Sequence, residues 1–318
     1  MKTKSQLFSN DILIIGYGAQ AKAWALNLRD SKREVTIGLR EASSSASLVK
    51  EMGFPTLTLS KDNISSYQNL IILTPDDQHS SILRSISSMF SEDQNIFYAH
   101  GFSVTYEKLN ELYPKQNHIL LAPKAIASEV RYAYETKGPL TAASSVEHAS
   151  SAQSQQSLKQ LAKDLGINVG PLEVSFKDET YGDLFSEQSI LCSLIPYGAK
   201  ASFDKLKEKG ISEDMAYIEC WHEVKLIADA MLKFGPVEFF KLISPNALMG
   251  GEKARKQIFS PNLLKTYDNL YSDIESGKFF HDTKDFDFQK LKSDVIKEWS
   301  NHPLQDLYNK LGTKLRPR

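Results

Sequence analysis

Short apolar runs alternate with amphipathic segments along the first half of the chain. The runs lie in "DILIIG", "REVTIGLR", "NLIILTPDD", "QNIFYAHGF" and "NHILLAPKAI". Each is bounded by glycine, proline or polar residues and predicts a short buried strand. One helical pattern begins near Ala19, after the first run. A second, in "SASLVKEMG", ends at Gly53. Strand, helix and strand at this spacing predict a parallel sheet with helices on its faces.

The pattern changes after about residue 175. A serine-rich stretch within residues 146–166 leads into another helix, and "INVGPLEV" is the last strand-like run. Periodicity and helix breakers then predict long helices, roughly at residues 180–209, 212–234, 236–243 and 260–276. We therefore expect an α/β fold, with a Rossmann-type parallel-sheet domain over residues 1–175 and an all-helical domain over residues 176–318.

Composition and charge exclude several classes of function. The 318 residues are 41% hydrophobic and 24% charged, and the net charge of -1 provides no basic field for nucleic acid or for an anionic membrane. The apolar run Ile12–Ile15 is too short for a signal peptide, and no later run reaches the length of a membrane span. Cys192 and Cys220 lie in apolar helical patterns, which predict buried, reduced thiols. We expect a cytoplasmic protein.

A glycine pattern follows the first predicted strand. Gly16, Gly18 and Ala21 fill the G-x-G-x-x-G/A spacing at the junction between a strand and a helix. Gly16 permits the tight turn, Gly18 lets the backbone approach a pyrophosphate, and the small third residue allows the helix to pack closely. Other strand–turn–helix units also tolerate glycines, but the position at the first strand favours a dinucleotide site.

The end of the second predicted strand distinguishes NADPH from NADH. An NAD site typically has an acidic residue there, which holds the ribose 2′-hydroxyl. Here Arg40 comes first, and Ser43, Ser44 and Ser45 follow. An arginine flanked by serines suits a 2′-phosphate by charge and by hydrogen bonds, although Glu41 argues against it and a serine-rich surface turn is the alternative. We predict NADPH.

The helix predicted near residue 180 carries two acids on its apolar stripe. Asp183 and Glu187 are one helical turn apart, and Ile190, Leu191 and Leu194 continue the same face. We expect an amphipathic helix to bury this face. Buried carboxylates without partners would be costly or would have to protonate.

A second predicted helix repeats this arrangement. Glu219 and Glu223 are also four residues apart, and the same face continues as apolar. Hard divalent cations would resolve the conflict, and oxygen ligands of this kind suit Mg²⁺. Solvated helix edges, or ion pairs with Lys200 or Lys225, would explain one such pair, but two pairs in a chain with a dinucleotide site favour a metal. His222 is a weaker candidate ligand.

Motifs spread over most of the chain resemble those of one family. They are "IIGYGAQAKAWALNLRDS", "GLREASSSA", "LTPDDQHS", "AHGF", "LAPK", "DLFSEQSILC", "YIECWHE" and "ISPNA". In this order they are similar to a cofactor turn, a 2′-phosphate loop, a loop beneath the nicotinamide, two strand-end motifs, two metal helices and a substrate serine loop. Over roughly residues 11–280, the chain resembles the ketol-acid reductoisomerases of branched-chain amino-acid biosynthesis.

The resemblance implies an enzyme, both oxidoreductase and isomerase, that depends on NADPH and two Mg²⁺ ions. An alkyl group of a 2-acetolactate-type substrate would migrate, and hydride from NADPH would then give a 2,3-dihydroxy acid. The metals would act as Lewis acids in both steps. The resemblance also implies a knotted helical domain and an intertwined homodimer or a higher homo-oligomer.

The same resemblance assigns the metal site residue by residue. Asp183 and Glu187 would be direct ligands, with Asp183 as the bridge between the two ions. Glu219 and Glu223 would complete the site through waters or substrate, with a neighbouring subunit as one source of these residues.

Further roles follow from the other motifs. Catalytic roles would fall to His100, Lys124 and Glu223, and Ser244 would hold the substrate carboxylate. His100 and Lys124 both follow apolar strands, at the edge where open α/β sheets bind ligands. The residues lining NADPH would be Gly16, Tyr17, Gly18, Ala19, Gln20, Arg40, Ser43, Ser45, Asp76, Gln78 and His79.

Departures from the family pattern leave alternatives open. Ala125–Ala127 replace a Gly-Pro-Gly type turn, and a loop that needs a positive φ would be strained there. Pro245 and Asn246 follow Ser244 where the family has Thr-Ala-Glu, the leader before the first strand is shortened, and the tail after about residue 280 looks unrelated to the family. The alternatives are a paralogue acting on a related 2-hydroxy-3-keto acid, a non-catalytic dinucleotide-binding homologue, and a simple 2-hydroxy-acid or 6-phosphogluconate-like dehydrogenase.

Overall fold

The computed structural model describes residues 12–147 and 152–315. Contacts divide the chain into two compact units, Met1–Gly182 and Asp183–Arg318. The division falls inside helix α8 (Phe176–Ser186). The domain boundary expected between residues 175 and 176 stays a prediction. Within the described ranges, no helix combines the length and the apolar character that crossing a membrane requires.

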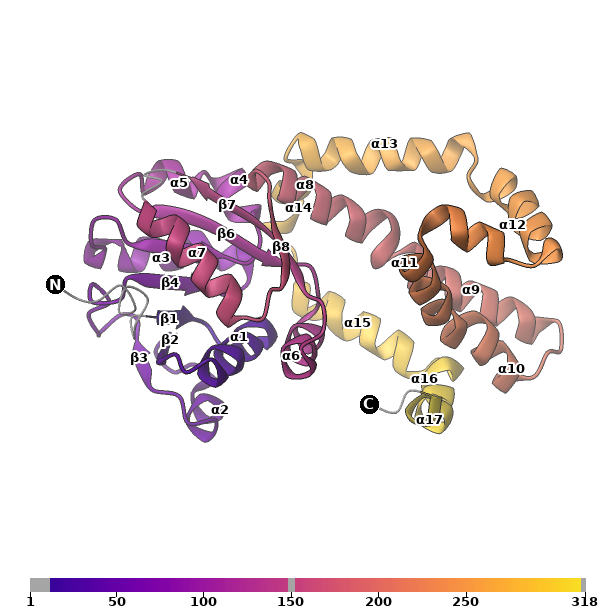
Figure 1. Cartoon of the computed structure of the whole chain (residues 1–318), viewed down its shortest axis with the longest axis horizontal. Helices are drawn as coiled ribbons and strands as arrows, with labels where there is room; N and C mark the ends of the chain where they lie inside the picture. The colour runs from indigo at the N-terminus through magenta and orange to yellow at the C-terminus, as the bar shows by residue number, and fades with distance from the viewer. Residues whose placement is uncertain (1–11, 148–151, 316–318) are drawn as a thin grey trace. The chain divides into compact units, whose positions relative to one another are not determined.

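The first unit is built on a single sheet, which runs from indigo to magenta in Figure 1. Its eight described strands are ordered β3-β2-β1-β4-β5-β6-β7-β8. The strands are β1 (Ile12–Ile15), β2 (Val35–Leu39), β3 (Thr56–Thr58), β4 (Asn69–Ile72), β5 (Asn95–Tyr98), β6 (Asn117–Pro123), β7 (Thr141–Glu147) and β8 (Val169–Glu173). Neighbours are parallel except β6 and β7. The predicted α/β, Rossmann-type class is confirmed, but the sheet is not purely parallel.

The hydrophobic pattern misses the antiparallel strand β7. Its sequence, "TAASSVE", contains alanine and serine where strands usually carry β-branched or aromatic residues. Nevertheless Ala142, Ala143 and Ser144 are buried, because β7 lies between β6 and β8 in the sheet. Neighbouring strands therefore override a weak local propensity. Residues 148–151 of the predicted serine-rich stretch lie outside the described residues.

Helices cover both faces of this sheet, as Figure 1 shows. One face carries α1 (Ala19–Asp30), α2 (Ala46–Glu51), α6 (Ala127–Thr136) and α7 (Ala152–Asp164). The other face carries α3 (His79–Ile86), α4 (Phe102–Glu107), α5 (Leu109–Leu112) and the start of α8. Alternate residues of β1 serve the two cores: Ile12 and Ile14 pack on one face, and Leu13 and Ile15 on the other. Burial on both faces is typical of strands that read as continuous apolar runs.

Three asparagines align the amino-terminal ends of the central strands. The side chain of Asn95 donates a hydrogen bond to Asn69 Oδ1 at 2.8 Å, and that of Asn117 donates to Asn95 Oδ1 at 3.0 Å. The three residues are in register across β4, β5 and β6. The opposite, carboxyl-terminal ends of these strands are consequently also level, and the candidate site is built there.

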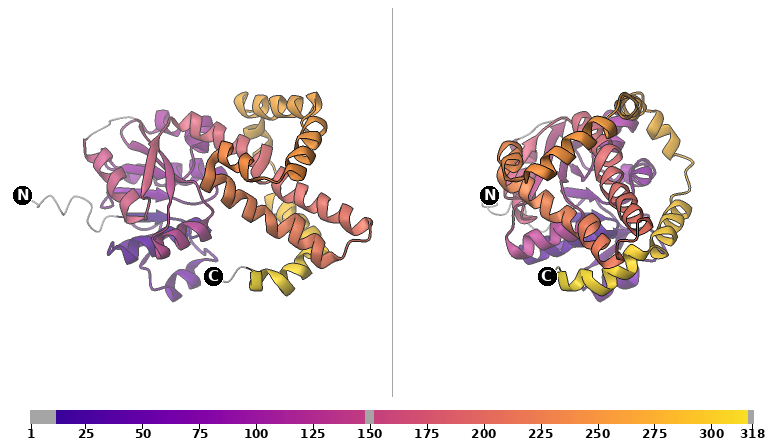
Figure 2. Two further views of the ribbon diagram at one scale, coloured as in Figure 1. Left: turned by 45° about the vertical axis from the view of Figure 1, so that its right-hand side comes forward. Right: turned by 90° about the vertical axis from the view of Figure 1, so that its right-hand side faces the viewer.

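The second unit is helical throughout its described residues, as predicted (Figures 1 and 2). Its α-helices are α9 (Leu194–Glu208), α10 (Glu213–Tyr217), α11 (Glu223–Leu242), α12 (Pro245–Ile258), α13 (Pro261–Glu275), α14 (Lys278–Thr283), α15 (Phe288–Ser300), α16 (Pro303–Leu307) and α17 (Thr313–Leu315). Three π-helical turns interrupt the regular pattern, namely η4 (Glu187–Leu191), η5 (Ile218–His222) and η6 (Tyr308–Gly312).

The predicted helix boundaries in this unit are partly wrong. The helix expected over residues 180–209 is broken after η4, where Ser193 leaves the helical conformation. The two helices expected over residues 212–234 and 236–243 are instead parts of a run that contains η5 and is kinked at Gly235 (φ 70°). Helix α12 and the helices after residue 277 have no counterpart in the prediction.

The second unit buries few side chains of its own. Its core joins Phe203, Ala216, Tyr217, Leu304 and Leu307, so the C-terminal segment supplies part of that core. Helices α11 and α12 contain no buried residue. The apolar stripes expected to be buried are exposed in the single chain, with Leu191 at 53% and Leu226 at 52%. That expectation is wrong for one copy of the chain.

The cysteines are free, as predicted, but not both are buried. Cys192 is exposed, because it follows η4 on the side where the single chain leaves the helix uncovered, and Cys220 is partly buried. Burial, and then the charges of Glu187 and Asp183, raise the pKa of the Cys192 thiol. Both acids therefore lie close to this thiol.

Candidate functional site

The turn between β1 and α1 has the geometry that the glycine pattern predicts. Gly16 adopts φ 95°, and a Cβ there would lie 2.7 Å from Thr74 Cγ2. Gly18 caps α1 with an extended backbone, and a Cβ on it would meet no atom of neighbouring elements within 4 Å. Ala21, in the first turn of α1, is fully buried in the core between the helix and the sheet. No neighbouring element therefore crowds Gly18 at the start of α1, which leaves room for a phosphate group at the helix N-terminus.

Buried polar atoms that lack a hydrogen-bond partner gather at this turn. Among the described residues they include the Tyr17 hydroxyl, Gln20 Oε1 and Thr74 Oγ1. Burial raises the pKa of Tyr17, although the nearby Arg29 charge lowers it, so the hydroxyl is neutral. Each such orphan costs about 1–3 kcal/mol, and a polar ligand that supplies partners would remove that cost. The turn therefore fits a bound dinucleotide.

The loop after β2 carries the predicted phosphate-binding side chains. Arg40 is exposed, and Ala42 adopts φ 54°, which turns the chain so that Ser43 N donates to Arg40 O at 3.2 Å. Ser43 Oγ accepts a hydrogen bond from Ser45 N at 3.3 Å. Arginine and two hydroxyls thus lie in one tight turn at the carboxyl end of β2.

The loop after β4 exposes Asp76 and Gln78 in part but buries His79. Asp76 and Gln78 are partly exposed in the short helical turn η2 (Asp76–Gln78). The His79 ring is buried: Nε2 donates to Thr74 O at 3.0 Å, and Nδ1 lies 2.8 Å from Ser103 Oγ. Burial lowers the pKa of His79 more than the Asp76 charge and the Thr74 carbonyl raise it. His79 is therefore a neutral brace for this loop, and its contact with NADPH stays a prediction.

His100 and Lys124 meet at a buried carboxylate. Lys124 Nζ donates to Glu179 Oε1 at 2.6 Å, and His100 Nε2 lies 3.9 Å from Glu179 Oε2. The Glu179 side chain is 1% exposed, whereas those of Lys124 and His100 are 36% and 20% exposed. Gly101 N also donates to Glu179 Oε2, at 2.7 Å. The two predicted catalytic residues come together through an acid that the sequence reading did not single out.

Glu179 could have been found in the same stripe as the predicted metal ligands. It lies four residues before Asp183, so both occupy one face of α8 in successive turns. Their carboxylate oxygens lie within 4.8 Å of one another. Glu179 does not stand out in the sequence, because no local pattern predicts that α8 begins next to the end of β5, where His100 lies.

A small residue at position 101 permits this approach. A Cβ on Gly101 would lie 2.5 Å from Thr180 Oγ1 and 2.6 Å from Phe176 O. The hydroxyls of Thr105 and Thr180 are 2.9 Å apart, which ties α4 to the same turn of α8. Close contact between α4 and α8 is thus what delivers Glu179 to His100 and Lys124.

Asp76 is a neighbour of His100. Asp76 Oδ2 accepts a hydrogen bond from His100 Nδ1 at 3.5 Å, and Asp76 Oδ1 lies 3.8 Å from His79 Nδ1. Burial raises the pKa of Asp76, but the hydrogen bond from His100 and the charge of His100 outweigh it, so the pKa is lower than usual. Asp76 is a carboxylate at neutral pH and fixes the orientation of the His100 ring.

Of the four acids predicted to bind metal, only Asp183 joins a group that could hold an ion in the described part of the single chain, together with His100 and Glu179. Asp183 and Glu223 are partly buried, and Glu187 and Glu219 are exposed. Among the described residues, Glu187, Glu219 and Glu223 belong to no group of three or more His, Cys, Asp or Glu side chains that could share an ion. Glu187 opens the π-helical turn η4 and Glu219 lies in η5, and such turns often occur at functional sites.

The two altered loops are unstrained. None of Ala125–Ala127 has a positive φ, so the strain expected there is absent. Ile126 caps α6 with an extended backbone. The side-chain Nε2 of Gln20 donates to Ala125 O at 3.2 Å. Ser244 caps α12, where its Oγ accepts from Ala247 N at 3.3 Å, and Pro245 suits the first helical position.

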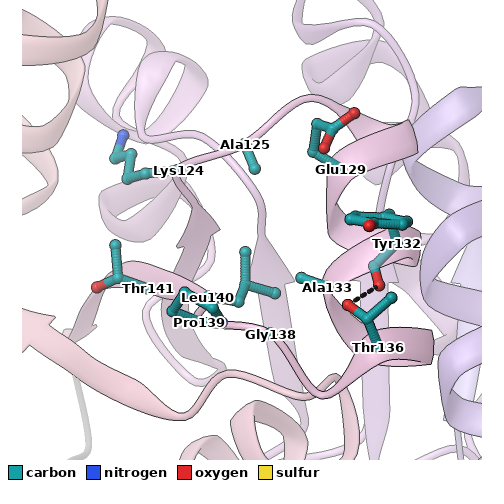
Figure 3. A pocket seen from close by; sticks show the side chains of 10 residues that line it. All are labelled: Lys124, Ala125, Glu129, Tyr132, Ala133, Thr136, Gly138, Pro139, Leu140 and Thr141. Atoms are coloured by element: carbon teal, nitrogen blue, oxygen red, sulfur yellow. Dashed lines mark hydrogen bonds between the residues drawn. The ribbon is translucent and has the colours of Figure 1, made fainter. Parts of the chain in front are cut away.

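A half-open cavity of about 320 Å³ borders Lys124 (Figure 3). It lies between α6 and the start of β7. Its lining residues are Lys124, Ala125, Glu129, Tyr132, Ala133, Thr136, Gly138, Pro139, Leu140 and Thr141. Lys124 and Ala125, which follow β6, form one side of this lining, and residues of α6 form another.

Two family models together match nearly the whole chain. Residues 6–170 match "Acetohydroxy acid isomeroreductase, NADPH-binding domain". Residues 176–318 match "Ketol-acid reductoisomerase, C-terminal domain". The second match includes the tail after residue 280, so the impression that this tail is unrelated to the family is wrong. Part of the tail packs in the core of the second unit, where no sequence motif marks it.

Individual relatives agree with these matches. A curated protein of Helicobacter pylori (strain ATCC 700392 / 26695), named ketol-acid reductoisomerase (NADP(+)), is 37% identical over 281 residues, which cover 87% of this chain and 83% of the relative. A solved NADH-preferring ketol-acid reductoisomerase from an uncultured archean has a TM-score of 0.84 and 27% identity, covering 96% and 95% of the two chains. The 1-pyrroline-5-carboxylate reductase of Streptococcus pyogenes (TM-score 0.59, 16% identity, 83% and 98% covered) shares the fold alone.

Proposed function

Because the chain belongs to the ketol-acid reductoisomerase family, we propose that it binds NADPH and Mg²⁺ and acts on a 2-acetolactate-type substrate. An alkyl group migrates between adjacent carbons, and reduction of the resulting 2-keto acid gives a 2,3-dihydroxy acid. The proposal includes a place in branched-chain amino-acid biosynthesis, a cytoplasmic location and a knotted helical region.

The observation that carries this proposal is the group formed by His100, Lys124 and Glu179. It lies at the carboxyl-terminal ends of β5 and β6, and the turn at Gly16 and Gly18 follows β1 at the same edge of the sheet. Open α/β sheets bind ligands at this edge. A buried carboxylate held between an ammonium group and an imidazole suits a reaction that moves a proton and develops charge on oxygen.

Each residue of this group has a chemical task. Asp76 accepts from His100 Nδ1 and orients the imidazole, whose Nε2 lies 3.9 Å from Glu179 Oε2, for proton exchange at the site. The Lys124 ammonium provides positive charge near a developing alkoxide. Glu179 holds the Lys124 ammonium, and its own charge is stabilised by the amide of Gly101. Glu223 is proposed as a further acid–base residue.

The donor chemistry fits Mg²⁺. Carboxylate oxygens of Glu179 and Asp183 lie in successive turns of one helix, and hard cations prefer such ligands. We propose Asp183 and Glu187 as direct ligands and Asp183 as the bridge between two ions. When bound, the ions would polarise the ketone and hydroxyl oxygens of the substrate. Ser244 is proposed to bind the substrate carboxylate.

We propose that a second copy of the chain supplies Glu219 and Glu223 to this metal site. Among the described residues of one copy, the acids of α11 and η5 belong to no group that could share an ion, and α11 exposes large apolar side chains. Leu232 is 87% exposed and Val237 is 66% exposed. Large exposed apolar faces mark interaction sites. A two-fold dimer would cover this face and would bring Glu219 and Glu223 to the metal site of the other copy.

The test is oxidation of NADPH with 2-acetolactate, with and without Mg²⁺. We expect turnover only when all three are present, and the product is identified as the 2,3-dihydroxy acid by mass spectrometry. Turnover without Mg²⁺ would point to a simple dehydrogenase. Turnover with a related 2-hydroxy-3-keto acid, but not with 2-acetolactate, would identify a paralogue. NADPH binding without turnover on any such acid would refute the catalytic proposal.

A further inference from the structure

Glu41 directly follows the predicted phosphate-binding Arg40. An acidic residue at the end of the second strand is what NAD sites use to hold the ribose 2′-hydroxyl, and its charge repels a 2′-phosphate. Family membership does not resolve this conflict, since the matched model is an NADPH-binding domain and the solved relative is described as preferring NADH. The preference of this chain must therefore depend on the surroundings of Glu41.

A lysine from the neighbouring strand holds this carboxylate. Lys61 Nζ donates to Glu41 Oε1, and the two residues are 20 positions apart in the chain. Strand β3 pairs in parallel with β2, so the ends of the two strands lie side by side. Leu59 N donates to Leu39 O at 3.0 Å and continues that pairing beyond β3. Lys61 therefore reaches Glu41 from the edge of the sheet.

The backbone that carries Lys61 is fixed by its own turn. Lys61 N and Asp62 N both donate to Thr58 O at 2.9 Å. Asp62 Oδ2 accepts from Thr58 N at 2.6 Å, so the acid next to Lys61 is used within this turn. The ammonium of Lys61 is left to pair with Glu41.

Arg40 does not pair with the adjacent Glu41. In the part of the chain that the structure describes, the Arg40 guanidinium forms no ion pair and no side-chain hydrogen bond. With Glu41 held by Lys61, the loop offers a free guanidinium and the hydroxyls of Ser43 and Ser45. Without Lys61, Glu41 would stand next to Arg40 and compete for it.

We propose that Lys61 determines the preference for NADPH over NADH by holding the Glu41 carboxylate. The pair cancels the charge that would repel a 2′-phosphate and prevents Glu41 from accepting hydrogen bonds from a free ribose 2′-hydroxyl. Lys61 acts on the cofactor through Glu41 and is a specificity-determining residue that the loop sequence alone does not reveal. This inference rests on the proposed function only for the identity of the cofactor.

The test measures dissociation constants of NADPH and NADH on the full-length chain, without substrate or Mg²⁺. Both side chains of the pair are more than half exposed, at 60% and 65%. Solvent and salt therefore screen the effect, and we expect Lys61→Met to lower the preference for NADPH by about three- to tenfold. Lys61→Arg keeps the ion pair and should keep the preference. Adding Glu41→Gln to Lys61→Met should restore it.

A matched control is available at the pair of Lys115 and Glu92. Their side chains are also exposed, at 73% and 80%, and they are 23 positions apart. Lys115→Met should leave the preference unchanged.

Two results would overturn the proposal. In one, Lys61→Met leaves the ratio of the two constants unchanged. In the other, it lowers the ratio equally whether residue 41 is Glu or Gln, which would mean that Lys61 acts on the phosphate directly. Because no turnover is measured, failure of the catalytic proposal would leave this result interpretable.

Discussion

The two units treat their charged residues in opposite ways. In the first unit, Glu179 is buried and bound by Lys124 and Gly101 within one chain. In the second, Glu187 and Glu219 are exposed, and Leu232 of α11 is 87% exposed. The contacts of Glu179 are all made within one chain, so the structure of one chain is enough to describe them. The second unit instead exposes large apolar side chains, which the proposed second copy would cover.

The largest expected effect is at Asp183. Asp183→Asn removes a proposed bridging ligand, and we expect turnover to fall roughly a thousandfold while NADPH still binds. The control is Asp178→Asn, because Asp178 is an exposed acid on the same helix. Equal loss in both variants, seen in NADPH oxidation assays, would show that α8 rather than the ligand is responsible.

A smaller loss is expected at Glu179. Glu179→Gln keeps the shape of the side chain but removes the charge that holds Lys124, and we expect kcat to fall about a hundredfold. Circular dichroism should show the fold unchanged. If kcat is unaltered and only KM for the substrate rises, Glu179 is a binding residue and the proposed role is wrong.

Gly101→Ala tests the approach of α4 to α8 that places Glu179. The added Cβ would lie 2.5 Å from Thr180 Oγ1, and we expect a loss of about 1–3 kcal/mol in the free energy of unfolding. Gly182→Ala is the matched control on α8, since its Cβ meets no atom of neighbouring elements within 4 Å. It should be neutral or stabilising by up to about 1 kcal/mol, from helix propensity. A harmless Gly101→Ala would refute the close-contact account.

The smallest effect is a pH dependence from His79. Burial lowers its pKa in the folded state, so the unfolded state binds the proton first as the pH falls. Stability of the first unit should therefore decline below a pH of about 6.5, with a slope from this residue of at most about 1.4 kcal/mol per pH unit.

His79→Gln should flatten that decline. Denaturation can be followed by fluorescence of Trp24, which is fully buried, after Trp221 and Trp299 are replaced by Phe. An unchanged slope between pH 7 and pH 5 in the His79→Gln chain would contradict the assignment.

Sequence patterns predicted the first unit better than the second for a physical reason. Strands buried on both faces, such as Ile12–Ile15, carry continuous apolar runs, and the turn at Gly16 needs a residue that tolerates φ 95°. Glu179 escaped because its partners are 55 to 79 positions away and meet it only through packing of α4 on α8. Distant contacts of this kind leave no local pattern.

The second unit was mispredicted where local pattern and environment disagree. The apolar stripe after Asp183 and Glu187 predicts burial, but Leu191 is exposed in one copy. The π-helical turns at Glu187 and Glu219 also shift the face on which later residues lie, which a fixed period of 3.6 residues cannot anticipate. An apolar pattern predicts burial, but it does not distinguish burial within one chain from burial against a second chain.

Complementation between two inactive variants tests most directly whether a second copy completes the metal site. Asp183→Asn and Glu223→Gln chains, differently tagged and produced together, pair at random, so that half of the dimers are mixed and can be isolated by tandem purification. If each site takes Asp183 from one copy and Glu223 from the other, every mixed dimer contains one intact site, and the unfractionated mixture should regain about a quarter of wild-type turnover. Activity no higher than that of the separate variants would contradict the account, because all four acids would then have to come from one chain.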